Sequence, residues 1–242
     1  MTSTPVTARA ARSRVTALRG ATPATLRSAV KIARAELTRG LGSSRYGLPA
    51  LHGIDRTLAD RHPGPGVFLE IGANDGYSFS NTYHLEKIRG WRGILIEPLP
   101  TMYRLCRLHR RRSVCFNLAC VGPDGPSSLT LVDRGLVSVS RGMMPAAEEQ
   151  QRVGGHTREI TVATSTMSAL IDRSGLGTPD VITIDVEGAE REVLKGLDLV
   201  RHAPRFLVVE TKDPEGISAL LDPFLRPTQR LSHHDWLFER SP

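Results

Sequence analysis

The feature that most constrains the fold is an alternation between short apolar runs and helix-like runs, which begins near Gly66 and continues along the chain. Strands that are apolar on both faces and separated by helices indicate parallel pairing in a sheet that helices cover on both sides. The strand-like runs are, in chain order, VFLEI (67–71), GILIE (93–97), VCFNLA (114–119), DVITIDV (180–186) and RFLVVE (205–210).

The end of the chain carries a different pattern. Residues 228–241, TQRLSHHDWLFERS, favour a hairpin that closes the sheet with antiparallel strands. We therefore predict an α/β fold, built on a doubly wound sheet that is mostly parallel and has a closing antiparallel hairpin. In such a sheet, ligands bind beyond the carboxyl ends of the strands, where the strand order reverses.

Composition divides the chain into three segments. Residues 1–22 are rich in Ala, Arg, Ser and Thr, and we expect a disordered basic leader. Residues 23–65 should form a helical segment, and residues 66–242 the main domain. Within that domain, residues at about 123–161 show little periodicity and are expected to be an irregular insertion, a candidate lid or substrate wall.

The first segment with a clear helical pattern is TPATLRSAVKIARAELTRG (22–40). A helix of this kind, basic and amphipathic, can pack on its own domain or lie on an anionic membrane. Both alternatives stay open at the level of sequence. The apolar residues that recur at helical spacing are Leu26, Ala29, Val30, Ala33 and Leu37.

The net charge of +7 is concentrated at the start of the chain. Residues 1–40 hold eight of the 32 Lys and Arg residues and one of the 25 Asp and Glu residues, which leaves 24 of each in the remainder. A main domain that is neutral by count and has no interleaved aromatic residues predicts no nucleic-acid partner. The run RLHRRR (107–112) is interpreted as the solvated end of a helix.

Hydropathy and cysteine usage indicate the compartment. No apolar run approaches the roughly 20 residues that a membrane span requires. Three cysteines without a CxxC pair predict reduced thiols and no structural zinc. We expect a cytoplasmic protein, with peripheral membrane association through the basic N-terminal segment as an alternative and a homo-oligomer as a further candidate state.

The turn after the first strand, IGANDGYS (71–78), predicts a ligand site. Gly72 and Gly76 remove the Cβ atoms that would hold a ligand away and permit positive φ. Glu97 ends the second strand, where an acid commonly accepts hydrogen bonds from both ribose hydroxyls of a nucleoside. These residues together predict a cofactor that contains a nucleoside.

The identity of the cofactor follows from the charge of this turn. The dinucleotide fingerprint G-x-G-x-x-G places a pyrophosphate at a helix N-terminus. Here Asn74 replaces the middle glycine, and Glu70 and Asp75 add negative charge. A turn flanked by acids suits S-adenosylmethionine, which carries an ammonium and a sulfonium. The alternative is that Glu70 and Asp75 only cap the helix that follows.

Four motifs in this order resemble the FkbM-type S-adenosylmethionine-dependent methyltransferases. They are FLEIGANDGYSFSNTYHLEK (68–87), GWRGILIEPLP (90–100), NLACVG (117–122) and VITIDVEGAEREVLKGL (181–197). The resemblance covers roughly residues 67–210 and implies a class I methyltransferase sheet, which is Rossmann-like. It most often implies methylation of an oxygen on a sugar or a sugar-bearing metabolite.

The resemblance also implies roles for individual residues. Glu97 matches the acid that binds ribose, and residues 117–120 match the segment near the adenine. Upstream, where many relatives carry a stretch with Gln, Gly, Glu and Asp, this chain reads SRYGLPALHGIDRTL (44–58), in which Tyr46 is a candidate contact. The predicted cofactor-binding residues are Glu70, Gly72, Asn74, Asp75, Gly76, Glu97, Pro98, Asn117, Ala119 and Cys120.

The motif IDVEGAE (184–190) supplies candidates for the chemistry. An alcohol must lose its proton before it attacks a methyl group, so a base or a metal ion is expected. Asp185 and Glu187 face the same side if the strand continues through them, and they are the predicted catalytic residues. Asp185 with Glu210 is the candidate pair for Mg²⁺, and Asp185 is equally a candidate base without metal.

These residues predict an S-adenosylmethionine-dependent methyltransferase. We expect O-methylation of a sugar hydroxyl on a glycosylated metabolite, glycolipid or polysaccharide, so the partner is a small-molecule or glycoconjugate acceptor. Two alternatives stay open. One is another small-molecule acceptor that is methylated at nitrogen, carboxyl or carbon, and the other is a cofactor-binding module without catalysis.

Overall fold

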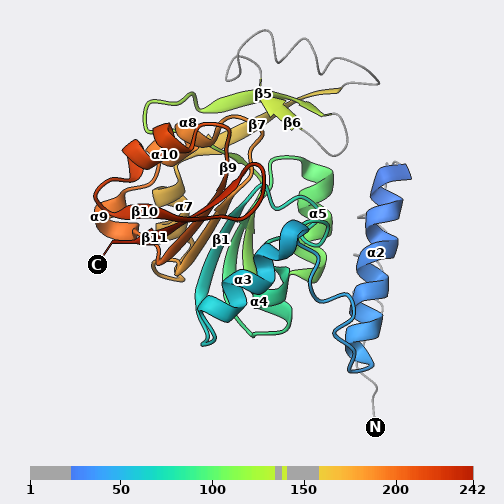
Figure 1. Ribbon diagram of the computed structural model, residues 1–242. Coiled ribbons are helices and arrows are strands. Elements are labelled where there is room, and N and C mark those ends of the chain that lie inside the picture. The colour runs from blue at the N-terminus through green and yellow to red at the C-terminus, as the bar shows by residue number, and fades with distance from the viewer. Residues whose placement is uncertain (1–22, 134–137, 141–157, 242) are drawn as a thin grey trace.

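A computed structural model describes residues 23–133, 138–140 and 158–241 of the chain. Its centre is a seven-stranded sheet with the order β10-β11-β9-β8-β1-β2-β3 (Figure 1). The strands are β1 Val67–Ile71, β2 Arg92–Ile96, β3 Ser113–Phe116, β8 Val181–Ile184, β9 Phe206–Glu210, β10 Leu225–Arg230 and β11 Asp235–Arg240.

The pairing of these strands confirms the predicted topology. The strands from β3 to β9 in the sheet are all parallel to their neighbours. Strand β11 is antiparallel to β9, and β10 is antiparallel to β11. The chain leaves β1 towards β2 and β3 on one side and returns to β8 on the other, so the order reverses at β1. The sheet is doubly wound and is closed by the expected antiparallel hairpin.

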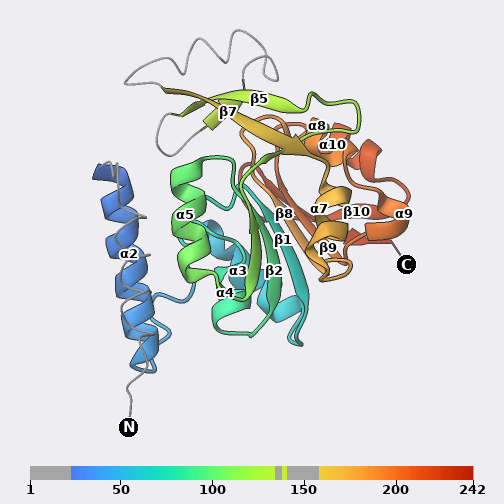
Figure 2. The same cartoon turned by 180° about the vertical axis from the view of Figure 1, so that it is seen from behind.

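Helices cover both faces of the sheet, as the apolar strands require (Figures 1 and 2). One face packs on α3 Ile54–Arg61, α4 Tyr83–Lys87 and α5 Pro100–His109. The other packs on α7 Met167–Ser174, α8 Glu190–Lys195 and α10 Pro214–Leu221. Two short elements complete the domain, the 3-10 helix η1 Leu51–Gly53 and α9 Leu199–His202.

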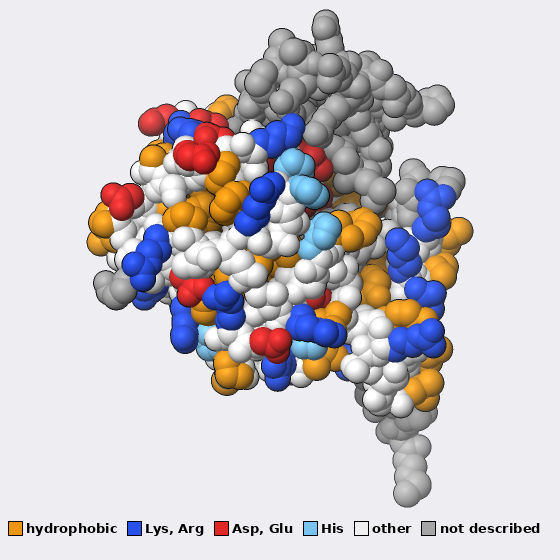
Figure 3. Space-filling model, in the orientation of Figure 1, with side chains coloured by type: hydrophobic (Ala, Val, Ile, Leu, Met, Phe, Trp, Pro, Cys, Tyr) orange, Lys and Arg blue, Asp and Glu red, His pale blue; other side chains and the backbone are white. Residues whose placement is uncertain are grey.

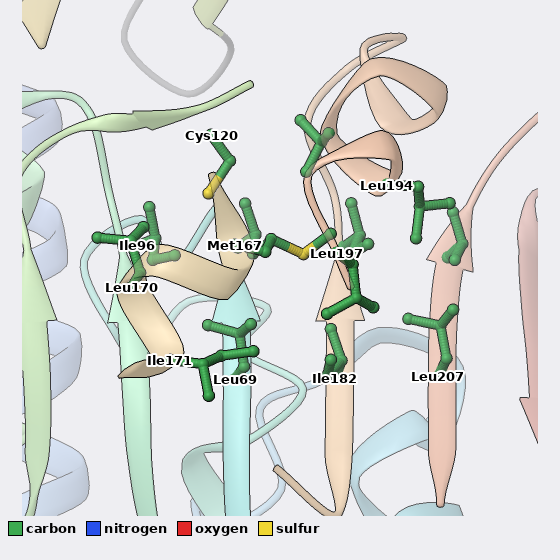
Figure 4. Close-up of a cluster of buried hydrophobic side chains, with 14 of the residues drawn as sticks. Leu69, Ile96, Cys120, Met167, Leu170, Ile171, Ile182, Leu194, Leu197 and Leu207 are labelled. Carbon is green, nitrogen blue, oxygen red and sulfur yellow. The ribbon is translucent and has the colours of Figure 1, made fainter. Parts of the chain in front are cut away.

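Alternation along each strand divides the core into two layers. Phe68 of β1 packs with α3 and α4, whereas Leu69 faces the opposite side. Figure 4 shows this second layer, in which Leu69, Ile182 and Leu207 of three neighbouring strands lie in one cluster with residues of helix α7. Trp91 is fully buried in the first layer, where it is part of the core.

The expectation of an irregular insertion at about 123–161 is wrong for its described part. Strands β5 Ser128–Asp133, β6 Ser138–Ser140 and β7 Arg158–Ser165 pair antiparallel, and β4 Ala119–Cys120 joins β7. This second sheet has the order β4-β7-β5-β6 and lies over one edge of the main sheet (Figures 1 and 2). The run SLTLVD alternates apolar and polar residues, which is a strand signal.

Helix α2, Pro23–Gly40, forms where the helical pattern predicts it and packs against the domain beside α5 (Figures 1 and 2). The face that it buries contains Thr25, Ser28, Ile32 and Ala35. Of the predicted apolar residues only Ala29 is partly buried, and the other four are exposed. None of the described helices is long and apolar enough to cross a membrane.

Candidate functional site

A cavity of about 380 Å³ lies at the carboxyl ends of β1, β2, β8 and β9, where the strand order reverses. Leu129 and Leu131 of the second sheet form part of its wall, and the role of the insertion as a substrate wall stays a prediction. Leu51 of η1 and Phe79, both about half exposed, also line the cavity.

Most of the predicted site residues meet in this cavity. Three do not line it: Asp75, Gly76 and Asn117. The predicted residues that line it are Glu70, Gly72, Asn74, Glu97, Pro98, Ala119, Cys120, Asp185, Glu187 and Glu210.

Glu97 is positioned as a binding group at the end of β2. One carboxylate oxygen accepts a hydrogen bond from the backbone N–H of Asn74 at 2.8 Å, and the other from that of Leu99 at 2.7 Å. These bonds fix the plane of the carboxylate. A carboxylate held in this way at the end of β2 is suited to accept hydrogen bonds from the hydroxyls of a ribose.

The positive φ predicted for the glycines of the turn is confirmed at both, but the close approach that they permit is to the protein itself. Gly72 has φ +85°, and a Cβ atom there would lie 2.0 Å from the carbonyl oxygen of Asp185. At Gly76, with φ +78°, a Cβ would meet Cys106 and Arg110. Both glycines therefore permit close approach within the protein, and only Gly72 borders the cavity.

Glu70 lines the cavity, but its carboxylate is engaged by the protein. It accepts hydrogen bonds from the hydroxyls of Ser80 and Thr82 and from the backbone N–H of Asn81. The guanidinium of Arg110 lies 3.7 Å away. Glu70 thus anchors the segment that follows the turn.

The burial of Arg110 was not predicted from the sequence. The interpretation of the run 107–112 as solvated is wrong for Arg110, which is fully buried. Its guanidinium binds Glu86 at 2.8 Å and donates to the carbonyl oxygen of Gly76 and to the hydroxyls of Ser80 and Thr82. The neighbours Arg111 and Arg112 are exposed, as interpreted.

Two other predicted cofactor residues make contacts that are structural. Asp75 accepts hydrogen bonds from the backbone N–H groups of Tyr77 and Ser78 and from the Ser78 hydroxyl, which fix the turn. Helix α4 begins only at Tyr83, so Asp75 does not cap the following helix as the alternative expects. The side-chain amide of Asn117 donates to the carbonyl oxygens of Glu97 and Pro98. It holds the end of β2 in place from outside the cavity. Their direct contact with a cofactor stays a prediction.

Asp185 and Glu210 form a carboxyl pair at the ends of β8 and β9. They extend the parallel register in which Ile184 lies opposite Val209, so the two side chains lie at neighbouring strand ends and line the same cavity. Burial first, and then the charge and hydrogen bond of Glu210, raise the pKa of Asp185 from 3.8 to about 8. The pair thus holds a proton near neutral pH.

Glu187 lines the same cavity as Asp185 and Glu210, but strand alternation does not place it there as predicted. Strand β8 ends at Ile184, so alternation does not extend to Glu187. A tight turn with φ +57° at Glu187 follows, and its side chain lines the same cavity. Its negative charge contributes to the raised pKa of Asp185.

Thr183 is a cavity residue that the sequence analysis did not single out. It is 1% exposed, lines the cavity and has a hydroxyl with no hydrogen-bond partner among the described residues. A buried hydroxyl without a partner is costly, so it indicates a polar group of a ligand at this point. The signal was available, because Thr183 precedes Asp185 by two residues in a strand-like run.

The charge of the lining is one-sided. Among the described residues that line the cavity, five are carboxylic acids and none is Lys, Arg or His. Such a lining suits a cationic ligand and is unfavourable for a pyrophosphate.

Tyr46 and the histidines His233 and His234 lie apart from the cavity. The ring of Tyr46 lies under the guanidinium of Arg34 at 4.3 Å, and Tyr46 does not line the cavity. His233 and His234 are exposed ahead of β11, and His156 lies outside the described residues. In the described ranges, no three His, Cys, Asp or Glu side chains are grouped so that they could hold a metal ion. The Asp185–Glu210 metal pair stays a prediction.

Comparison with known structures gives distant similarities. A methyltransferase FkbM from Methylobacillus flagellatus KT aligns over 72% of this chain and 43% of its own, with 14% identity and a TM-score of 0.45. This chain thus spans less than half of that protein. A TehB-like SAM-dependent methyltransferase from Corynebacterium glutamicum aligns over 89% and 99%, with 9% identity and a TM-score of 0.43.

A third structure is the SAH-bound methyltransferase PaMTH1 from Podospora anserina, which aligns over 100% of this chain and 99% of its own at 13% identity, with a TM-score of 0.43. No curated protein matches the sequence. The sequence profile described as Methyltransferase FkbM domain matches residues 70–236, which is more than half of the chain and includes every residue of the cavity that the motifs predicted. The chain belongs to the FkbM family of methyltransferases.

Proposed function

We propose that this protein transfers the methyl group of S-adenosylmethionine to a sugar hydroxyl of a glycosylated metabolite, glycolipid or polysaccharide. The observation that carries the proposal is the cavity at the reversal of strand order, which has an acidic lining, a fixed Glu97 and a carboxyl pair with a raised pKa. Family membership supports methyl transfer. The sugar acceptor rests on the resemblance of the motifs.

The residues of the cavity fit this cofactor. Glu97 would accept hydrogen bonds from the ribose hydroxyls, and Ala119 and Cys120 would lie against the adenine. The unpartnered hydroxyl of Thr183 offers a hydrogen bond to a polar group of the ligand. When bound, S-adenosylmethionine supplies a methyl group on a sulfonium that is already a good leaving group. The acids around the cavity complement its positive charge.

The Asp185–Glu210 pair supplies the base that an alcohol needs. The acceptor hydroxyl would give its proton to the ionised carboxylate of Asp185, and the hydrogen bond to Glu210 would hold that proton between the two groups. A base with a pKa of about 8 is well matched to proton transfer near neutral pH. The cavity wall then aligns the oxygen for in-line attack, which is a proximity effect.

Mg²⁺ on Asp185 and Glu210 is the other route. It requires both carboxylates to be ionised, whereas the shared hydrogen bond favours one proton on the pair. A turnover assay distinguishes the routes. If the pair acts as a base, EDTA leaves methyl transfer unchanged, and if it holds Mg²⁺, EDTA stops transfer and added Mg²⁺ restores it.

Cofactor binding is tested by calorimetry with S-adenosylmethionine. Glu97→Ala should weaken binding by about 1–3 kcal/mol, since the ribose hydroxyls lose their acceptor. The matched control is Glu215→Ala, an exposed acid on α10, which should bind as the wild type does. Thermal unfolding of both variants separates a local effect from unfolding. Unchanged affinity in Glu97→Ala would remove this residue from the site.

Methyl transfer is tested with labelled S-adenosylmethionine and a panel of sugars and glycolipids. We expect label on an acceptor oxygen, located by mass spectrometry. Label on nitrogen, carboxyl or carbon would replace the sugar hydroxyl by the corresponding acceptor. Cofactor binding without transfer to any acceptor would favour a binding module.

A further inference from the structure

Helix α2 has an exposed apolar face that the fold leaves uncovered. We define the outer face as Leu26, Val30, Ala33 and Leu37, which recur at helical spacing. Leu26, Val30 and Leu37 are 56%, 61% and 67% exposed, and Leu41, directly after the helix, is 79% exposed. Of the nine large hydrophobic side chains that are exposed in the described residues, four lie in this row.

The opposite face of α2 fixes the helix to the domain. Ile32 and Ala35 pack on Tyr77 and Tyr83, and Ala29 contacts a cluster with Met102 and Leu105 of the domain. Glu36 accepts a hydrogen bond from the Tyr83 hydroxyl and forms an ion pair with Lys87 at 3.1 Å. The outer face is therefore held outward by the packing of the inner one.

A row of cations runs along the outer face. Arg27, Lys31 and Arg34 are exposed and recur at helical spacing, so they lie together on one flank of the apolar row. Figure 3 shows basic and hydrophobic side chains side by side along this helix. The acid of the helix, Glu36, points to the domain and also pairs with Arg39. The sequence before α2 adds four Arg and no acid.

We propose that the outer face of α2 binds the surface of an anionic lipid membrane, with the helix axis parallel to it. An apolar row beside a basic row is the pattern of helices that lie in the membrane interface. The apolar side chains enter the boundary of the acyl chains, and the cations meet the lipid phosphates. Charge complementarity selects this occupant over a second copy of the chain, whose outer face carries the same positive charge.

The cavity lies beside this surface. The ammonium group of Lys31 lies 5.9 Å from the centre of the Phe79 ring, and Phe79 lines the cavity while 48% of it is exposed. Phe79 has φ +64°, a backbone region that bulky residues rarely adopt and that is retained where the surroundings hold it. A glycolipid acceptor would thus reach the cavity from the membrane, a step that rests on the proposed function.

Co-sedimentation of the full chain with vesicles tests the docking surface without any acceptor. We expect binding to vesicles of equal parts phosphatidylcholine and phosphatidylglycerol, little binding to phosphatidylcholine alone, and weaker binding as salt rises. Leu26→Gln with Val30→Gln and Leu37→Gln should lower the partition at least about tenfold. These side chains are exposed, so the thermal unfolding temperature should stay unchanged.

The structure offers a matched control with the same chemistry. Arg27→Gln with Val30→Gln changes one exposed Arg and one exposed Val on the outer face. Arg226→Gln with Val200→Gln changes the same two residue types on β10 and α9, at the other side of the main sheet (Figure 1). Only the first pair should weaken vesicle binding, by about tenfold.

Three results would overturn the proposal. In the first, the wild type does not bind the anionic vesicles. In the second, the two matched pairs of substitutions leave vesicle binding equal. In the third, the wild type is a dimer that does not bind vesicles and that dissociates only when the outer face is substituted. The last result would assign the face to a second copy. If the vesicles bind but no sugar or glycolipid is methylated, the docking surface stands and the proposed function fails.

Discussion

Two groups of carboxylates lie at the ends of the neighbouring strands β1 and β8, and they differ in exposure and in what balances their charge: Glu70 and Glu86 are buried, whereas Asp185 is exposed towards the cavity and Glu210 is half-buried. Glu70, with Glu86, surrounds the fully buried guanidinium of Arg110 and accepts hydroxyl and backbone donors. Asp185 has another acid, Glu210, as its partner, and the pKa of Asp185 rises to about 8. Buried acids with a countercharge build a framework, whereas an acid that lines a cavity beside other acids and has no countercharge is ready to exchange a proton.

The largest expected effect comes from removing the proton acceptor. Asp185→Asn keeps the shape of the side chain and cannot take a proton from the acceptor hydroxyl, so turnover should fall by about 10²–10⁴-fold while cofactor affinity is retained. Single-turnover kinetics and calorimetry measure the two quantities. Asp60→Asn, an exposed acid on α3, is the control and should leave both unchanged. Near-normal turnover would place the base elsewhere and remove the contrast between the two groups.

The framework is tested by removing its cation. Arg110→Met should lower the free energy of unfolding by about 3–5 kcal/mol, because Glu70 and Glu86 stay buried without their partner. Urea unfolding measures this change. Arg111→Met, one residue along and exposed, should change it by less than about 0.5 kcal/mol. Similar effects in the two variants would show that the Arg110 network is not what stabilises the turn.

The same contrast explains what could be predicted from sequence. Each of the five strand-like runs forms strand in the structure. In four of them the apolar residues are buried on both faces and leave few alternatives, whereas β3 is a half-buried edge strand. Glu97 and Asp185 could be predicted because each directly follows a strand, and the carboxyl ends of parallel strands lie together at the ligand site. The closing hairpin, β10 and β11, followed from the strand-like residues of the tail.

What was missed depends on contacts between distant segments. Nothing in the run 107–112 distinguishes Arg110 from Arg111, since burial of one and exposure of the other is decided by Glu70 and Glu86, which lie 40 and 24 residues earlier. In α2, periodicity correctly gave a helix but not the buried face, because the domain offers Tyr77 and Tyr83 to Ile32 and Ala35 and leaves the more apolar side outside. Hydrophobic periodicity identifies the apolar face of a helix, but tertiary packing decides whether that face is buried or exposed.

The smallest expected effect is a change in the pH dependence of turnover, and it tests the role of Glu210 in raising the pKa of Asp185. Because its charge and hydrogen bond help to raise the pKa of Asp185, Glu210→Gln should lower that pKa below the wild-type value of about 8. Wild-type turnover should rise with pH up to about 8, as the base loses its proton, and in Glu210→Gln this limb should move to lower pH. The rate on the alkaline plateau should fall by less than about tenfold, since the base itself remains.

The free energy of unfolding gives an independent measurement. It should fall as pH rises, whereas turnover should rise. In the folded wild type Asp185 keeps its proton up to about pH 8, whereas in the unfolded chain it releases it near the ordinary pKa of 3.8. Between these values the folded state binds more protons, so the free energy of unfolding decreases as pH rises and levels off above about 8. Glu210→Gln should make this decrease smaller, and Asp185→Asn should abolish its contribution. An unchanged pH dependence in both variants would mean that the two carboxyl groups do not share a proton, and the distinction between framework and reactive pair would then rest on Arg110 alone.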